Sequence, residues 1–152
     1  MTVETIKDVL ALTRELHANL ACTLERAAHQ AHEERLHMLL DYLARHEREL
    51  SRVVALSESD AQAAALHTWC AEYVDKHPFA LATLGGIDYA SMDTAEVMRS
   101  LLTIHERLID LYRYLATRAE VSSAEELLSN LLALEQHEAM RMVRDAEELE
   151  DL

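Results

Sequence analysis

The chain has 152 residues, a formal net charge of −14 and a hydrophobic content of 50%. This length is typical of one domain with a sizeable core, and the acidic charge argues against a nucleic-acid partner, because phosphate contacts need a basic surface. Only two glycines and one proline interrupt a composition rich in helix-forming residues, so long helices are expected.

The first part of the chain predicts two amphipathic helices, over residues 4–28 and 34–56. Apolar positions recur at alternating steps of four and three, which is the spacing of one helix face. In the first helix this face comprises Ile6, Leu10, Thr13, His17, Leu20 and Leu24; in the second it comprises Leu36, Leu40, Leu43, Glu47, Leu50 and Val54. The polar stretch HQAHEE between them is short, which predicts antiparallel neighbours.

The middle of the chain differs from both ends. Residues 60–76 predict a short helix that Pro78 stops, and the stretch ALATLGGIDYASMD, which holds both glycines, predicts a loop. This segment is long enough to be a crossover between two helical hairpins.

The last part predicts a second hairpin, with helices over residues 94–119 and 123–149. Thr94 is a candidate cap for the first of these helices, and Ser122 with Glu125 has the spacing of a capping box for the second. The predicted apolar faces comprise Val97, Leu101, Ile104, Leu108, Leu111 and Leu115, then Leu127, Leu131, Leu134, Glu138 and Met142. The chain is therefore predicted to be a single all-α domain over residues 1–152, a four-helix bundle of two antiparallel hairpins joined by a long crossover containing a short helix.

An internal repeat links the two hairpins. A shift of 91 residues places LARHEREL (Leu43–Leu50) on LEQHEAMR (Leu134–Arg141), so that His46 meets His137 and Glu47 meets Glu138. This architecture resembles the ferritin-like superfamily, and its rubrerythrin-like branch in particular, from Thr2 to about Leu149. The resemblance implies a di-iron site with a glutamate from the first and third helices and a Glu-x-x-His motif from the second and fourth. Both of these motifs are degenerate here, because Leu50 and Arg141 stand where the histidines would be.

Helical geometry selects a different set of inward polar residues. At about 100° per residue, Glu15 and Glu106 face away from the core. The inward set that remains is His17, Glu47, His105, Glu135 and Glu138. Buried carboxylates are costly unless they are paired or bound to a metal, so these five residues are candidate ligands for iron, or for manganese or zinc. The alternative is structural: the histidines, Arg14 or Arg141 pair with the glutamates.

Other sites are weaker. A haemerythrin-like arrangement would use His105 and Asp110 in a His-x4-Asp element, but Asp110 lies on the polar side of its helix. Neither a phosphate-binding loop nor a nucleophile motif is present in the sequence. Cys22 and Cys70 do not suggest a disulfide framework, and no apolar run approaches a membrane span, so a cytoplasmic location without a membrane partner is expected.

Two functions follow as expectations. The first is a non-catalytic or degenerate ferritin-like protein that acts through homo-association, most simply as a dimer. The second is a metal-binding protein with redox or iron-handling chemistry at the inward carboxylates and histidines. Metal content is the measurement that separates them.

Overall fold

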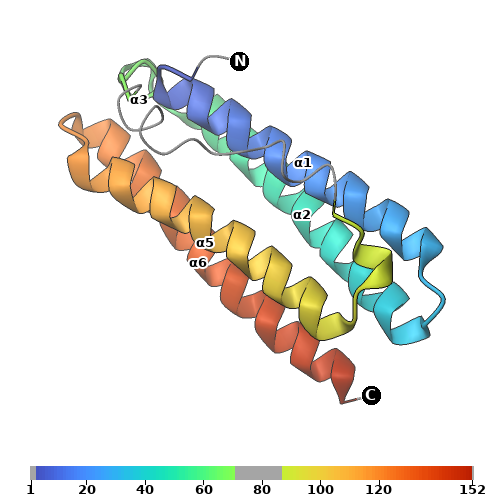
Figure 1. The fold of residues 1–152 in the computed structure, drawn as a ribbon. Coiled ribbons are helices and arrows are strands. Elements are labelled where there is room, and N and C mark those ends of the chain that lie inside the picture. The colour runs from blue at the N-terminus through green and yellow to red at the C-terminus, as the bar shows by residue number, and fades with distance from the viewer. Residues whose placement is uncertain (1–2, 71–86, 152) are drawn as a thin grey trace.

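The protein is a bundle of four long helices in a computed structural model that describes residues 3–70 and 87–151 (Figure 1). The long helices are α1 (Ile6–Gln30), α2 (Glu34–Asp60), α5 (Thr94–Arg118) and α6 (Ser122–Glu150). Within these described ranges two short elements accompany them: α3 (Ala63–Leu66) and the 3₁₀ helix η2 (Tyr89–Ser91). Within the described ranges the structure has no β-strand, so the all-α prediction is confirmed.

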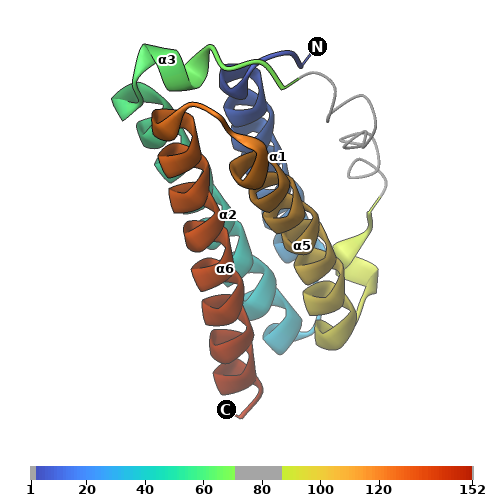
Figure 2. The ribbon, with the colours of Figure 1, turned by 90° about the vertical axis from the view of Figure 1, so that its left-hand side faces the viewer.

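The helices pair as two antiparallel hairpins. The helix α2 returns to the end of the bundle at which α1 begins, whereas α5 begins at the opposite end (Figures 1 and 2). Consequently α1 and α6 run in one direction and α2 and α5 in the other. The two short turns within the hairpins, at residues 31–33 and 119–121, lie where the sequence predicts them.

The starts of the helices show which capping predictions succeed. Thr5 caps α1, and its side chain and that of Asp8 form a reciprocal capping box. The cap of α5 is Asp93, one residue before the predicted Thr94, and its carboxylate accepts the Glu96 N–H at 2.8 Å. The predicted capping box of the last helix is absent, because α6 begins directly after Val121 with no side-chain cap.

Removal of the Thr5 cap should weaken α1. We expect Thr5→Ala to lower the free energy of unfolding by about 1 kcal/mol, because the Asp8 N–H loses its acceptor and the first turn loses its box. Urea denaturation followed by circular dichroism measures the change. The control is Thr103→Ala, which removes an exposed threonine from the interior of α5. An equal loss in both variants would mean that capping is not the cause.

The chain after α2 departs from the predicted helix over residues 60–76. Between residues 61 and 70 only Ala63–Leu66 is helical. Thr68 accepts a hydrogen bond from the Ile6 N–H at 3.0 Å, and the Cys70 N–H donates to Glu4 at 2.7 Å. These backbone groups bond to Glu4 and to Ile6, the first residue of α1, and are therefore not available for a continuing helix. The predicted helical residues 71–76, Pro78 and both glycines lie outside the described residues.

The core consists mainly of leucine, with Val9, Val54, Val97, Tyr89 and Tyr112 among the fully buried side chains. The buried face of α6 is rotated from the predicted one. It comprises Ala124, Leu128, Leu131, Glu135, Met142 and Ala146. Leu127, Leu134 and Glu138 of the predicted face are only half-buried. Adjacent leucines at 127–128 and 131–132 permit either phase, and the packed bundle selects the one that buries Glu135. None of the described helices is both long and apolar enough to cross a membrane.

Candidate metal centre

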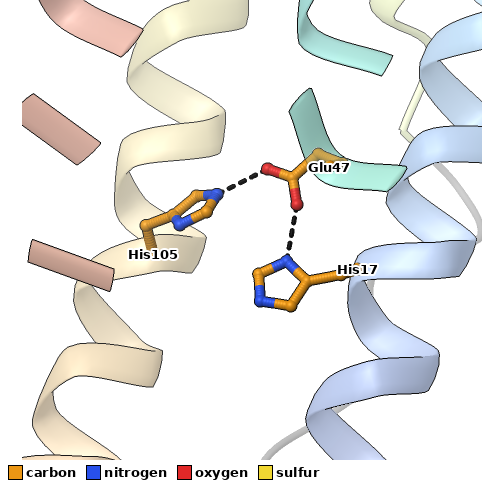
Figure 3. A group of neighbouring side chains, drawn as sticks. All are labelled: His17, Glu47 and His105. Atoms are coloured by element: carbon orange, nitrogen blue, oxygen red, sulfur yellow. Dashed lines mark hydrogen bonds and ion pairs between the residues drawn. The ribbon is translucent and has the colours of Figure 1, made fainter. Parts of the chain in front are cut away.

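Each long helix contributes one polar side chain to a cluster at the centre of the bundle. His17 comes from α1, Glu47 from α2, His105 from α5 and Glu135 from α6. All four side chains have no exposed surface. We call these four residues the His–Glu ring. Figure 3 shows His17 and His105 converging on Glu47, which uses a different carboxylate oxygen for each imidazole.

The ring is closed by four short hydrogen bonds. His17 Nδ1 lies 2.6 Å from Glu47 and His105 Nδ1 lies 2.9 Å from Glu135, so each Nδ1 bonds to the glutamate of its own hairpin. His17 Nε2 lies 2.7 Å from Glu135 and His105 Nε2 lies 2.5 Å from Glu47, so each Nε2 bonds to the other hairpin. Every ring nitrogen and every carboxylate oxygen of the four residues therefore has one partner.

The number of protons in the ring follows from these contacts. Each of the four bonds needs one proton, and an ionised carboxylate supplies none. With both glutamates ionised, both imidazoles must therefore carry two protons each. The ring then holds two positive and two negative charges and is neutral, which is how a buried ionic cluster avoids an uncompensated charge.

The electrostatics agree with this protonation state. Burial alone would lower the pKa of His17, but the charges of Glu135 and Glu47 outweigh it and raise the pKa to about 9. Burial is likewise outweighed at His105, where the two glutamates raise the pKa to about 10. Burial would raise the pKa of Glu135, but His17 and His105 lower it to about 2. The same balance holds the pKa of Glu47 well below its usual range.

The structure brings together four of the five predicted ligands. Glu138 is the exception: its side chain is 14% exposed and lies 2.6 Å from His46 Nε2, outside the ring. The reason is the phase of α6, which points Glu135 inward and turns Glu138 toward α2. The histidines do pair with the glutamates, as the structural alternative proposed, whereas Arg14 pairs with Glu58 and Arg141 lies near Asp145.

The internal repeat has a different register from the one that the sequence suggests. His17 and Glu47 are 30 residues apart, and so are His105 and Glu135. A shift of 88 residues, from 17 to 105 and from 47 to 135, therefore carries one half of the ring onto the other. The shift of 91 residues aligned two adjacent His-Glu pairs, and it placed Glu138 where Glu135 belongs. Equal His–Glu spacings in the two hairpins were the signal that could have identified the ring.

Two tyrosines near these groups were not predicted as part of a site. The Tyr112 hydroxyl is buried and has no hydrogen bond of normal geometry among the described residues. Burial and the charge of Glu135 raise the pKa of Tyr112 far above its usual range, against a smaller opposing effect of the nearby Thr13 hydroxyl. Tyr42 stacks on His46 and donates to Asp145 at 2.5 Å. Phenols on helix faces resemble ordinary core residues in sequence, so nothing marked them.

The donor set fits a metal ion. His17, Glu47 and His105 each offer one ligand atom, and these atoms lie within 4.8 Å of one another. Two imidazoles with carboxylates suit first-row transition metals such as iron, manganese and zinc, whereas magnesium and calcium prefer oxygen alone. The buried Tyr112 hydroxyl is a further polar atom near Glu135 that is left without a hydrogen bond in the described part of the chain.

Comparison with known proteins identifies no relative: no protein-family model, no curated protein and no solved structure matches the chain. The fold and the site nevertheless define a class. The protein is an all-α helical bundle with a fully buried cluster of histidine and glutamate that could hold a metal ion.

Proposed function

We propose that the protein is a metal-binding member of the ferritin-like superfamily and that the His–Glu ring holds a first-row transition metal for redox or iron-handling chemistry. The observation that carries the proposal is the ring itself: two histidines and two glutamates, one from each long helix, meet with no exposed surface. Iron is the metal that the superfamily resemblance implies, and manganese and zinc suit the same ligands.

Charge balance supports a single ion. A divalent cation that displaces two of the four ring protons leaves two neutral imidazoles, two carboxylates and the cation, so the ring stays neutral. Two divalent ions on the same four residues would leave two positive charges in a buried site, which is costly. The ring also has fewer ligands than the six of the di-iron pattern, since His17 and His105 occupy the helices that would supply two of the glutamates.

The surrounding side chains would keep the site dry. Leu43 and Leu50 flank Glu47 on α2, and Leu101 and Leu108 flank His105 on α5; each is at most 2% exposed. The glutamates would bind the ion through oxygens that already point at the imidazoles, while each histidine would keep one N–H for a carboxylate. When bound, the ion would supply Lewis-acid or redox chemistry in a water-excluded centre.

Metal titration tests the proposal. We expect the chelator-treated protein to bind about one Fe²⁺, Mn²⁺ or Zn²⁺ per chain under anaerobic conditions, measured by equilibrium dialysis and elemental analysis. The expectation follows from the charge balance of a buried four-residue ring. Glu135→Gln should abolish this uptake. With only one carboxylate left in the ring, a bound divalent ion would leave an uncompensated positive charge in the core.

The matched control is Glu106→Gln, which changes an exposed glutamate on α5 and should leave the uptake unchanged. Absence of tight uptake by the wild-type protein for all three metals would sink the proposal. Equal uptake by Glu135→Gln and the wild-type protein would place the metal elsewhere.

One observation favours a second candidate function, in which the ring is a metal-free clamp and the bundle acts by homo-association. Every ring nitrogen and oxygen already has a hydrogen-bond partner, so the cluster is complete without an ion. Several large apolar side chains are exposed and available for self-association: Trp69 at 63%, Met140 at 70% and Leu56 at 48%. A monomer in sedimentation analysis at micromolar concentration would contradict this candidate.

A further inference from the structure

A second histidine–glutamate pair lies beside the ring. His46 on α2 and Glu138 on α6 approach within 2.6 Å, between His46 Nε2 and a Glu138 oxygen. Their side chains are 10% and 14% exposed, whereas those of the ring have no exposed surface. Both side chains of the outer pair therefore touch solvent, although the His46 Nε2 atom itself is buried, whereas the side chains of the ring do not.

The contact within the outer pair is close enough for an ion pair but lacks the geometry of a hydrogen bond. His46 Nε2 is fully buried and has no hydrogen-bond partner among the residues that the structure describes, although the Glu138 oxygen is so close. Two ligand atoms that bind one ion at about 2.0–2.2 Å, at roughly a right angle, lie only about 3 Å apart. The nitrogen and the oxygen of the outer pair thus have nearly the spacing of neighbouring ligands of one cation.

The outer pair is connected to the ring and to the surface. His46 directly precedes Glu47, and Glu138 lies one helical turn after Glu135. On the other side, Tyr42 stacks on His46 with ring centroids 5.8 Å apart and donates to Asp145, which is 24% exposed. Cations lie near Asp145: the guanidinium of Arg141 is 3.9 Å away and that of Arg144 is 3.5 Å away. Oxygen and nitrogen donors therefore continue along α2 and α6 from the surface to the ring.

The internal repeat shows that this polar connection exists on one side only. The shift of 88 residues that carries Glu47 onto Glu135 carries His46 onto Leu134, and it carries Leu50 onto Glu138. At the repeat-related position, therefore, the outer pair is replaced by two leucines. Leu50 is 2% exposed. If His46 and Glu138 served only to pack the core, nothing would require the two hairpins to differ here. A route for a cation to the ring from one side would require it.

We propose that His46 and Glu138 form an outer cation site through which a divalent metal ion reaches the buried ring. The inference rests on the proposed function, because the ring is the site that would receive the ion. With two protein ligands the outer site binds the ion weakly and mostly through water, so it transfers the ion and does not store it. The net charge of −14 attracts cations to the protein as a whole.

Stopped-flow mixing of the metal-free protein with Co²⁺, followed by visible absorption, measures the rate of uptake, and equilibrium dialysis measures the final amount bound. We expect His46→Ala and Glu138→Gln to slow uptake at least tenfold while the final amount remains one ion per chain. His137→Ala and Glu147→Gln are matched controls, because both residues are exposed on α6. They should load at the wild-type rate.

Unchanged rates in both outer-pair variants would overturn the inference while leaving the proposed function intact. A fall in the final amount bound would also overturn it, because the pair would then belong to the centre itself. Failure of the proposed function has a separate signature: the wild-type protein would show only one weak site, which Glu138→Gln removes and Glu135→Gln does not. In that case the outer pair would bind the metal without passing it to the ring.

Discussion

Glu47→Ala should lower the free energy of unfolding of the metal-free protein by about 3–5 kcal/mol at neutral pH. Removal of this carboxylate leaves His17 Nδ1 and His105 Nε2 without an acceptor, and it leaves an uncompensated positive charge in the core. Such a loss is a large fraction of the stability of a typical domain. Guanidinium denaturation measures it, and Glu49→Ala, at an exposed position two residues away, should change little.

Replacement of the whole ring should have the opposite outcome. In the variant with His17→Leu, Glu47→Met, His105→Leu and Glu135→Met, four charges leave the core together and apolar groups of similar size take their place. We expect this variant to be as stable as the wild-type protein, or more stable by about 1–4 kcal/mol, and to bind no metal in the core. A loss as large as that of Glu47→Ala would show that the ring is needed for folding, and it would favour the metal-free clamp.

Alkaline pH should destabilise the metal-free protein steeply. The pKa values of His17 and His105 are raised to about 9 and about 10, from an ordinary value of 6.5. At pH values between 6.5 and these raised pKa values, the native state holds up to two more protons than the unfolded state. The free energy of unfolding should therefore fall by up to about 3 kcal/mol per pH unit as the pH rises above 6.5. This contribution is fully present below pH 6.5 and is lost above about pH 10.

At acid pH the free energy of unfolding should change in the opposite direction, rising with pH. Glu135 has a pKa of about 2 in the folded protein, from an ordinary value of 4.5, so its contribution is present above pH 4.5 and is lost as the pH falls toward 2. The ring should thus stabilise the fold most between about pH 4.5 and 6.5. Urea denaturation at a series of pH values tests this profile. Replacement of all four ring residues by apolar side chains should remove the alkaline slope, and a slope that persists would assign it to other groups.

Periodicity was sufficient to predict the four long helices, because each buries one apolar stripe and each turn between hairpin partners is short. It also separated Glu47 from Glu15, since a side chain on the apolar stripe must face the core. The segment after α2 was harder. Backbone bonds from Ile6 and Cys70 hold it against the start of the chain, and such long-range pairing leaves no local signature.

The ring could be predicted as a set of residues but not as an arrangement. The structure places four of the five candidates in the ring, yet paired leucines in α6 leave the phase of that helix open by one residue. The sequence therefore puts Glu138 on the predicted apolar stripe and Glu135 only beside it. The bonding pattern depends on where four helices place their side chains relative to one another. The role of His46 depends on its distance from Glu138, which no spacing within a single helix determines.

The His–Glu ring has the symmetry of a dimer inside a single chain. Each hairpin supplies one histidine and one glutamate, with Nδ1 bonding within the hairpin and Nε2 across to the other. Two identical hairpins related by a two-fold axis would build the same four-residue centre from only two positions in the sequence. Joining both halves in one polypeptide frees them to differ. The contact between His46 and Glu138 is such a difference. It places polar side chains beside the symmetric centre on one side, where the repeat-related side has leucines.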